Sequence, residues 1–118
     1  MPRSAAEYLQ HILDEIDYLS SHASATTKAN FFEDETLKRS FVRSIEVIGE
    51  AVKQIPARVR AEHPEIEWRL MAGMRDRLIH SYFGIDYDVI WDVAGNKLPQ
   101  LRNNLQQILT CEIERRGD

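Results

Sequence analysis

Residues 33–55 read EDETLKRSFVRSIEVIGEAVKQI, and this stretch decides the fold class. Its apolar residues recur at helical spacing, which is typical of an amphipathic helix. They are Leu37, Phe41, Ile45, Ile48, Val52 and Ile55. Acidic residues occupy the first turn, where the helix dipole favours negative charge, and Pro56 follows as a stop. The pattern predicts a helix from Glu33 to Ile55 with one face in the core.

The sequence before this stretch predicts one more helix and a loop. Ser4 and Glu7 form a capping-box signature at the start of an apolar period. This period predicts a first helix from about Ala5 to Ser21. Residues 22–30 contain no periodic apolar pattern and are rich in small polar residues, so we predict a loop there.

The second half of the chain is also predicted to be helical, and no strand is needed anywhere. We expect a short helical turn between Pro56 and Pro64, and then a helix through Trp68 with a bend at Gly73. A short helix capped by Asp86 and a last helix from near Pro99 complete the chain. The predicted fold class is therefore all-α, a compact up-and-down bundle of five to six helices.

Length and composition predict one ordinary globular domain over residues 1–118. The formal net charge is −4, from fifteen basic and nineteen acidic residues, so the overall field does not attract nucleic acid. The chain shows no signal-peptide core and no apolar run of membrane-spanning length, so we expect a cytoplasmic location. A single cysteine, Cys111, and histidines without ligand spacing give no support to a metal site, and no cofactor is expected.

The candidate site is the segment 73–83, which reads GMRDRLIHSYF. An arginine guanidinium matches a phosphodiester, and the unperturbed pKa of a histidine allows proton transfer near neutral pH. Together these residue types predict a site for phosphate chemistry. Asp76 is either a surface acid or a residue that orients Arg75 or His80. Tyr82 adds a hydroxyl two residues after His80.

An ideal helix through this segment does not bring Arg75 and His80 to one face. At about 100° per residue, Arg75 and Tyr82 lie within roughly 20° of each other, whereas Arg75 and His80 lie roughly 140° apart. Arg77, about 60° from His80, is a rival for the arginine role. The site then requires a deformation of the helix near His80, an arginine that reaches around it, or a second copy of the chain.

Polar residues of the 33–55 helix are candidates to support the site. Gly49 costs about 1 kcal/mol in a helix relative to alanine, so it predicts the close approach of another backbone. Glu46 and Glu50 lie one turn apart, and Arg43 lies one turn before Glu46. This charged stripe is either a solvated face or a second layer that holds the arginines of residues 73–83.

Five separated motifs give the chain a resemblance to a known family. They are R-x4-H-x-Y at 75–82, RSIEVIGEAVKQI at 43–55, HPEIEW at 63–68, DYDVIWDV at 86–93 and KLPQL at 97–101. Together they resemble the HepT family of the HEPN superfamily. That family consists of all-helical ribonuclease toxins of type VII toxin–antitoxin systems, each paired with a minimal nucleotidyltransferase antitoxin. The resemblance extends from Tyr8 to about Leu109.

The resemblance implies an activity, partners and residue roles. It implies metal-independent cleavage of RNA by a homodimer whose R-x4-H motifs meet in a cleft at the interface. By position, it assigns catalysis to Arg75 and His80, a supporting polar role to Asp76, and modification with AMP by the antitoxin to Tyr82. AMP on Tyr82 would neutralise the toxin by placing bulk and negative charge in the RNA site. Whether dimers assemble further with the antitoxin is left open.

A function from another class competes with the nuclease. Helical domains of this superfamily also serve without cleavage, as nucleotide-binding or partner-docking modules, and the net charge of −4 fits that role. Expression of the chain without its partner distinguishes the two, because a nuclease toxin is tolerated poorly and a docking module is harmless.

Overall fold

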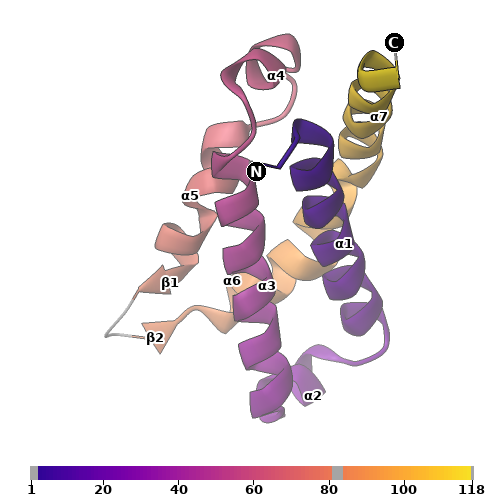
Figure 1. Cartoon of the computed structure of the whole chain (residues 1–118). Coiled ribbons are helices and arrows are strands. Elements are labelled where there is room, and N and C mark those ends of the chain that lie inside the picture. Colours follow the sequence, from indigo (N-terminus) through magenta and orange to yellow (C-terminus); the bar gives the residue numbers. More distant parts are fainter. Residues whose placement is uncertain (1–2, 81–83, 118) are drawn as a thin grey trace.

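Four long helices form the body of the protein in the computed structural model, which describes residues 3–80 and 84–117 (Figure 1). They are α1 (Ala5–Ser24), α3 (Glu35–Lys53), α5 (Trp68–Leu78) and α7 (Leu98–Gly117). Helix α3 lies between α1 and α5, and α1 also packs along α7. A cluster of buried apolar side chains fills the space between these helices.

The predicted capping box starts α1, and Asp34, which the sequence predicts to lie within the first turn, instead caps α3. Ser4 Oγ accepts a hydrogen bond from the backbone N–H of Glu7, and the Glu7 carboxylate accepts one from the backbone N–H of Ser4. The Asp34 carboxylate accepts a hydrogen bond from the N–H of Leu37 at the start of α3. The predicted apolar stripe faces the core, with Leu37 partly buried and the others buried: Phe41, Ile45, Ile48, Val52 and Ile55. The predicted apolar stripe is therefore confirmed, but the helix runs from Glu35 to Lys53 and not from Glu33 to Ile55.

A short helix, α2 (Lys28–Glu33), occupies part of the chain that the sequence predicts to be a loop. Thr27 caps this helix with its hydroxyl. Phe31 is fully buried, and its ring centroid lies 4.9 Å from that of Phe41 and 5.1 Å from that of Trp91. The loop prediction for residues 22–30 is thus wrong at both ends of the range. Helix α1 continues to Ser24, and α2 begins at Lys28 because the buried Phe31 anchors it.

The short helix α4 (Ala57–Glu62) is fastened to α7 by ion pairs. Arg58 donates from Nη1 and Nη2 to the two carboxylate oxygens of Glu112, at 3.2 and 2.7 Å. Arg115 of α7 donates in turn to Glu62, at 3.1 Å. The Glu112 side chain is only 5% exposed, whereas that of Arg58 is 45% exposed. The hydrogen bonds from Arg58 lower the pKa of the Glu112 carboxyl below its ordinary range, although burial acts in the opposite direction.

We expect Arg58→Met to destabilise the protein near neutral pH more than Glu112→Gln does. The first change leaves a buried carboxylate without its two donors, whereas the second leaves an arginine that can turn to water. Because the folded-state pKa of Glu112 is lowered, its stabilisation is present above the ordinary pKa of glutamate, about 4.3, and is lost as the pH falls through the lower folded value. Urea unfolding should therefore show a smaller gap between wild type and Arg58→Met at about pH 3, and an equal gap at both pH values would contradict this.

The chain turns between α5 and α6 through a short antiparallel strand pair, β1 (Ile79–His80) and β2 (Gly84–Ile85). Asp86 then caps α6 (Tyr87–Asp92), as predicted. Helix α6, the π-helical stretch η1 (Val93–Lys97) and α7 follow one another without a break. With α1 to α5, this segment gives six helical segments in the described part of the chain, which confirms the predicted all-α bundle. The two-residue strands were not expected from the sequence.

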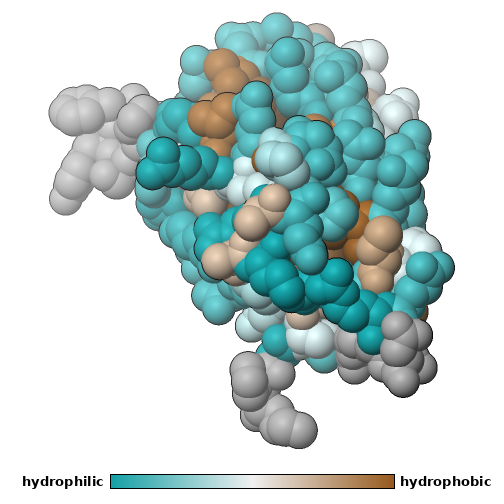
Figure 2. Space-filling model, turned by 90° about the horizontal axis from the view of Figure 1, so that it is seen from above, coloured by the Kyte–Doolittle hydropathy of each residue, from teal (hydrophilic) through white to brown (hydrophobic). Residues whose placement is uncertain are grey.

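The end of the bundle that carries α4 is mainly hydrophilic (Figure 2). Figure 2, which looks down on the end that carries α4, shows hydrophobic areas that are small and separate. Among the side chains that the structure describes, the large apolar ones that are exposed each lie on a different helix: Tyr18, Phe32, Leu70, Val89 and Ile113. Across residues 3–80 and 84–117, no helix combines the length and the hydropathy needed to cross a membrane.

Candidate functional site

Arg75 lies on the exposed side of α5, next to α3. Its Nε donates to Glu46 Oε2 at 3.4 Å, and its Nη1 donates to Asp76 Oδ1 at 3.4 Å. Both contacts are somewhat longer than the usual N–H···O hydrogen bond, and the Arg75 side chain remains 46% exposed. Two carboxylates therefore orient the guanidinium loosely, while part of it still faces solvent.

Gly49 allows α5 to come this close to α3. A Cβ atom at position 49 would lie 3.4 Å from the carbonyl oxygen of Ala72 and 4.0 Å from the Cβ of Arg75. The predicted close approach of another backbone is confirmed, and that backbone belongs to α5. The same contact sets the position of Arg75 relative to Glu46.

His80 follows the end of α5 and does not continue the helix. Helix α5 ends at Leu78, and the backbone of His80 pairs with Gly84 in the β1–β2 ladder. Gly84 has φ +99°, a conformation that glycine adopts readily and other residues rarely do. The prediction of one helix through residues 73–83 is therefore wrong at Ile79 and His80. The side chain of His80 and the whole of Tyr82 lie outside the described residues.

This backbone geometry changes how Arg75 relates to the rest of the motif. The separation of about 140° from His80 applies only to a continuous helix, and no helix joins the two residues. The backbone departs from the helix before His80, which is one of the three ways to assemble the site. The prediction that Arg75 and Tyr82 share a helical face also assumed a continuous helix, so it no longer has support.

Arg77 points to a different side of α5 from Arg75. Its Nη2 donates to the carbonyl oxygen of Leu70 at 2.8 Å, back along the helix. Its Nη1 would lie 3.3 Å from a Cβ atom placed at Gly73, so the glycine makes room for this guanidinium. Helix α5 continues through Gly73, where the sequence predicts a bend. Arg77 lines a groove between α5 and the α6–α7 segment, away from Glu46.

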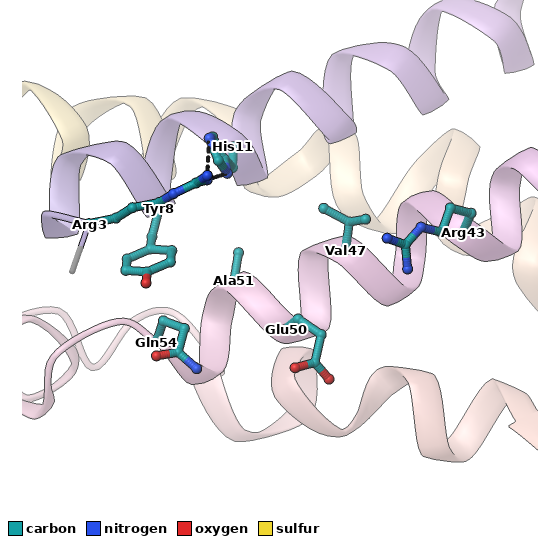
Figure 3. A pocket seen from close by; sticks show the side chains of 8 residues that line it. All are labelled: Arg3, Tyr8, His11, Arg43, Val47, Glu50, Ala51 and Gln54. Atoms are coloured by element: carbon teal, nitrogen blue, oxygen red, sulfur yellow. Dashed lines mark hydrogen bonds between the residues drawn. The ribbon is translucent and has the colours of Figure 1, made fainter. Parts of the chain in front are cut away.

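The three residues of the charged stripe of α3 do not all face the same helix, because one meets α5 and two line a hollow toward α1. Glu46 contacts Arg75 of α5, as the second-layer interpretation predicts. Glu50 instead contacts Lys53, with 3.5 Å between Oε1 and Nζ. Arg43 and Glu50 both line a hollow between α3 and α1 (Figure 3). Of the three candidate residues on α3, only Glu46 therefore contacts the arginine of the motif.

The same hollow contains three side chains that sequence reasoning did not select. Arg3, Tyr8 and His11 line it from the α1 side. In the sequence Tyr8 belongs to the apolar period of the first helix, and no pattern distinguishes Arg3 or His11. Only the packing of α1 on α3 brings them to the same hollow as Arg43, so no local signal could have identified them.

The chemistry available around Arg75 is anion binding. An exposed guanidinium can hold a phosphate through paired hydrogen bonds, and the chain places a histidine five positions later, just beyond the helix end. Among the described side chains, no group of three or more His, Cys, Asp or Glu is arranged to hold a metal ion.

Comparison with known proteins identifies the family. Residues 12–108 match the family described as "Ribonuclease HepT-like". A "Putative RNase" of Caldanaerobacter subterraneus subsp. tengcongensis is 43% identical over 89% of this chain and 94% of its own length. A "Probable ribonuclease HepT" of Thermococcus cleftensis is 37% identical over 92% of this chain and 98% of its own length. No solved structure matches the chain. By this match and these relatives, the chain belongs to the HepT-like ribonuclease family.

Proposed function

We propose that this protein is a metal-independent endoribonuclease and the toxin of a toxin–antitoxin pair, acting on RNA as a homodimer. The observation that carries the proposal is that, in a chain of a ribonuclease family, the R-x4-H motif spans the end of α5. The guanidinium of Arg75 donates to the carboxylates of Glu46 and Asp76, and His80 follows after α5 has ended. Because the backbone leaves the helix before His80, the separation of about 140° on an ideal helix does not separate His80 from a phosphate bound by Arg75.

In the proposed reaction, His80 takes the proton from a ribose 2′-hydroxyl. The O2′ atom attacks the adjacent phosphorus, the P–O5′ bond breaks, and O5′ takes up a proton. The products are a 2′,3′-cyclic phosphate and a free 5′-hydroxyl. Arg75 stabilises the negative charge that grows on the phosphoryl oxygens in the transition state. DNA lacks the attacking hydroxyl and should not be cut.

Cleavage of RNA by the purified protein in the presence of EDTA tests this reaction. We expect single-stranded RNA to be cut and the matching DNA to stay intact, with 2′,3′-cyclic phosphate ends detected by mass spectrometry. A His80→Ala preparation made in the same way controls for contaminating nucleases. Activity that disappears in EDTA and returns with added metal would refute the metal-free reaction, and products with a 3′-hydroxyl would exclude attack by the 2′-hydroxyl.

We also propose that a nucleotidyltransferase antitoxin neutralises the protein by transferring AMP to Tyr82. In this step the phenolic oxygen attacks the α-phosphorus of ATP, pyrophosphate leaves, and the hydroxyl proton passes to solvent. Tyr82 lies two residues after His80, so the attached AMP would bring bulk and negative charge to the place where an RNA phosphate binds. Like charges repel, and RNA binding should weaken accordingly.

Mass spectrometry after incubation with ATP and the cognate nucleotidyltransferase checks this assignment. The peptide that contains Tyr82 should gain the mass of one AMP group, and a Tyr82→Phe protein should gain none. Tyr18→Phe, which changes an exposed tyrosine on α1, is the matched control and should be modified like wild type. Modification of wild type at a residue other than Tyr82 would contradict the proposal.

The net charge of −4 favours a second candidate function. In this alternative, the chain is a non-catalytic helical module that binds a nucleotide or docks a nucleotidyltransferase partner. Expression without a partner distinguishes the two functions. A nuclease should inhibit growth and degrade RNA, whereas a docking module should do neither.

A further inference from the structure

A hollow of about 410 Å³ lies between α1 and α3, on the opposite side of α3 from α5 (Figure 3). Its size falls within the range of about 300–1,000 Å³ that is typical of small-ligand pockets. Six of the side chains that line it give it its chemistry: Arg3, Tyr8, His11, Arg43, Val47 and Ala51. None of the roles proposed above uses the α1 side of this hollow.

Two arginines at the hollow lack a carboxylate partner. Within the described residues, Arg43 has no hydrogen bond or ion pair, and Figure 3 shows its side chain extending along α3 toward Val47. Arg3 Nη1 lies 3.1 Å from each ring nitrogen of His11, so its neighbour is an imidazole and not an acid. By contrast, other arginines of the bundle are paired with carboxylates: Arg58, Arg102 and Arg115. The hollow therefore offers two cations to an anionic ligand.

The acid at the hollow does not neutralise these cations. Glu50 contacts Lys53, with 3.5 Å between Oε1 and Nζ. In Figure 3 its carboxylate points away from α1, whereas Tyr8 and His11 approach the hollow from that helix.

The rest of the lining is aromatic and apolar. The ring of Tyr8 projects from α1 toward α3, where Val47 and Ala51 present small apolar side chains (Figure 3). Aromatic rings beside arginines bind single-stranded nucleic acid, because the ring stacks on a base while the guanidinium holds the backbone. A free phosphate would use the arginines and leave this apolar surface unused. The combination fits a nucleotide better than an inorganic anion.

Helix α3 connects the hollow with the catalytic motif. Arg43 precedes Glu46 by three residues, which is less than one helical turn and about 4.5 Å along the axis. Glu46 in turn contacts Arg75 on α5. An RNA strand with its scissile phosphate at Arg75 can therefore continue across the exposed side of α3 to Arg43.

The geometry points to a substrate subsite: the hollow between α1 and α3 holds a nucleotide of the single-stranded RNA next to the one that is cleaved. Tyr8 stacks on its base, and Arg43 and Arg3 bind its phosphate. This inference rests on the proposed ribonuclease function and adds a second binding position to it. It predicts a preference for single strands, because a base held in a duplex cannot reach the Tyr8 ring.

Binding of a short 2′-O-methyl RNA strand tests the subsite separately from cleavage, because this RNA lacks the attacking hydroxyl. In fluorescence anisotropy, Arg43→Gln should weaken binding severalfold and reduce the slope of log K against log salt by about 0.7, the value for one phosphate contact on a single strand. Tyr8→Leu keeps an apolar side chain but removes the ring, and it should weaken binding about tenfold with little change in the salt slope. Arg60→Gln removes the same charge from an exposed position on α4 and should bind like wild type.

The outcomes distinguish this subsite from the nuclease function. If wild type cleaves RNA but the Arg43→Gln and Tyr8→Leu variants bind RNA as tightly as wild type, the subsite is overturned and the nuclease function stands. Selective loss of binding in these two variants supports the subsite, even where wild type fails to cleave and the nuclease function falls. No binding of RNA by wild type overturns the subsite. Loss of binding together with a changed oligomeric state, seen by light scattering, also overturns it in favour of an interface between two copies.

Discussion

Replacing His80 with alanine is expected to lower the rate of RNA cleavage by at least about a hundredfold, because general acid–base catalysis contributes about 10²–10⁴ to a rate. His80 is the group proposed to take the 2′-hydroxyl proton, and alanine cannot do so. The backbone pairing of position 80 with Gly84 does not depend on the side chain, so the turn between α5 and α6 should persist. Cleavage of a fluorescent RNA measures the effect, and growth inhibition on expression provides a second readout.

A second histidine provides the control for this variant. His22 lies near the end of α1, where its ring contacts that of Tyr18 at 4.3 Å between centroids. His22→Ala should therefore cleave RNA at the wild-type rate. The His80→Ala protein should keep the circular dichroism spectrum and the oligomeric state of wild type. Undiminished cleavage and toxicity in His80→Ala would remove His80 from the mechanism.

A leucine at position 49 is expected to destabilise the fold by about 1–3 kcal/mol, the usual cost of overpacking, and to reduce cleavage as well. A Cβ atom alone would already lie 3.4 Å from the Ala72 carbonyl oxygen, so the remaining atoms of leucine must push α5 away from α3. Because α5 carries Arg75, this displacement also moves the guanidinium away from Glu46. Urea unfolding and the RNA cleavage assay measure the two effects.

Gly49→Ala is the matched control for the leucine variant. Its Cβ makes an ordinary van der Waals contact at 3.4 Å from the Ala72 carbonyl oxygen, and alanine gains about 1 kcal/mol of helix propensity over glycine. We therefore expect this variant to be at least as stable as wild type and to cleave RNA at the wild-type rate. A Gly49→Leu protein as stable as wild type would contradict the close packing of α5 on α3.

Helices that bury an apolar stripe of their own were predictable from the sequence. The stripe of α3 is buried where the period places it, and the period is a relation between near neighbours in the chain, although the helix begins at Glu35 and not at Glu33. The capping box of Ser4 and Glu7 is equally local. Such features need no knowledge of the rest of the fold, which is why the bundle class follows from them.

Elements that depend on distant contacts were not predictable in the same way. Helix α2 is stabilised by Phe31, a single side chain whose aromatic neighbours come from elsewhere in the chain. The helical period of residues 73–83 continues past Leu78, whereas the backbone leaves the helix and His80 pairs with Gly84. No residue before that point marks the change.

The candidate site was predictable only in part, for a related reason. Gly49 signalled the approach of a backbone, and the contact of Glu46 with Arg75 agrees with one of the two interpretations of the α3 stripe. Helical spacing shows which residues share a stripe, but it does not show which neighbouring helix each side meets. Arg43 and Glu50 therefore could not be assigned to the hollow on the α1 side.

The packing of α1 on α7 has a consequence for the biosynthesis of this protein. Arg102 of α7 donates to Asp17 of α1 from Nε at 2.6 Å and from Nη2 at 3.0 Å, and Arg58 of α4 reaches Glu112 farther along α7. The ribosome makes α7 after the other helices of the bundle, so a nascent chain without it leaves the inner side of α1 uncovered and α4 unfastened. The bundle can close only after α7 has been made. Removal of the last turns of α7 would therefore affect α1 and α4 as well.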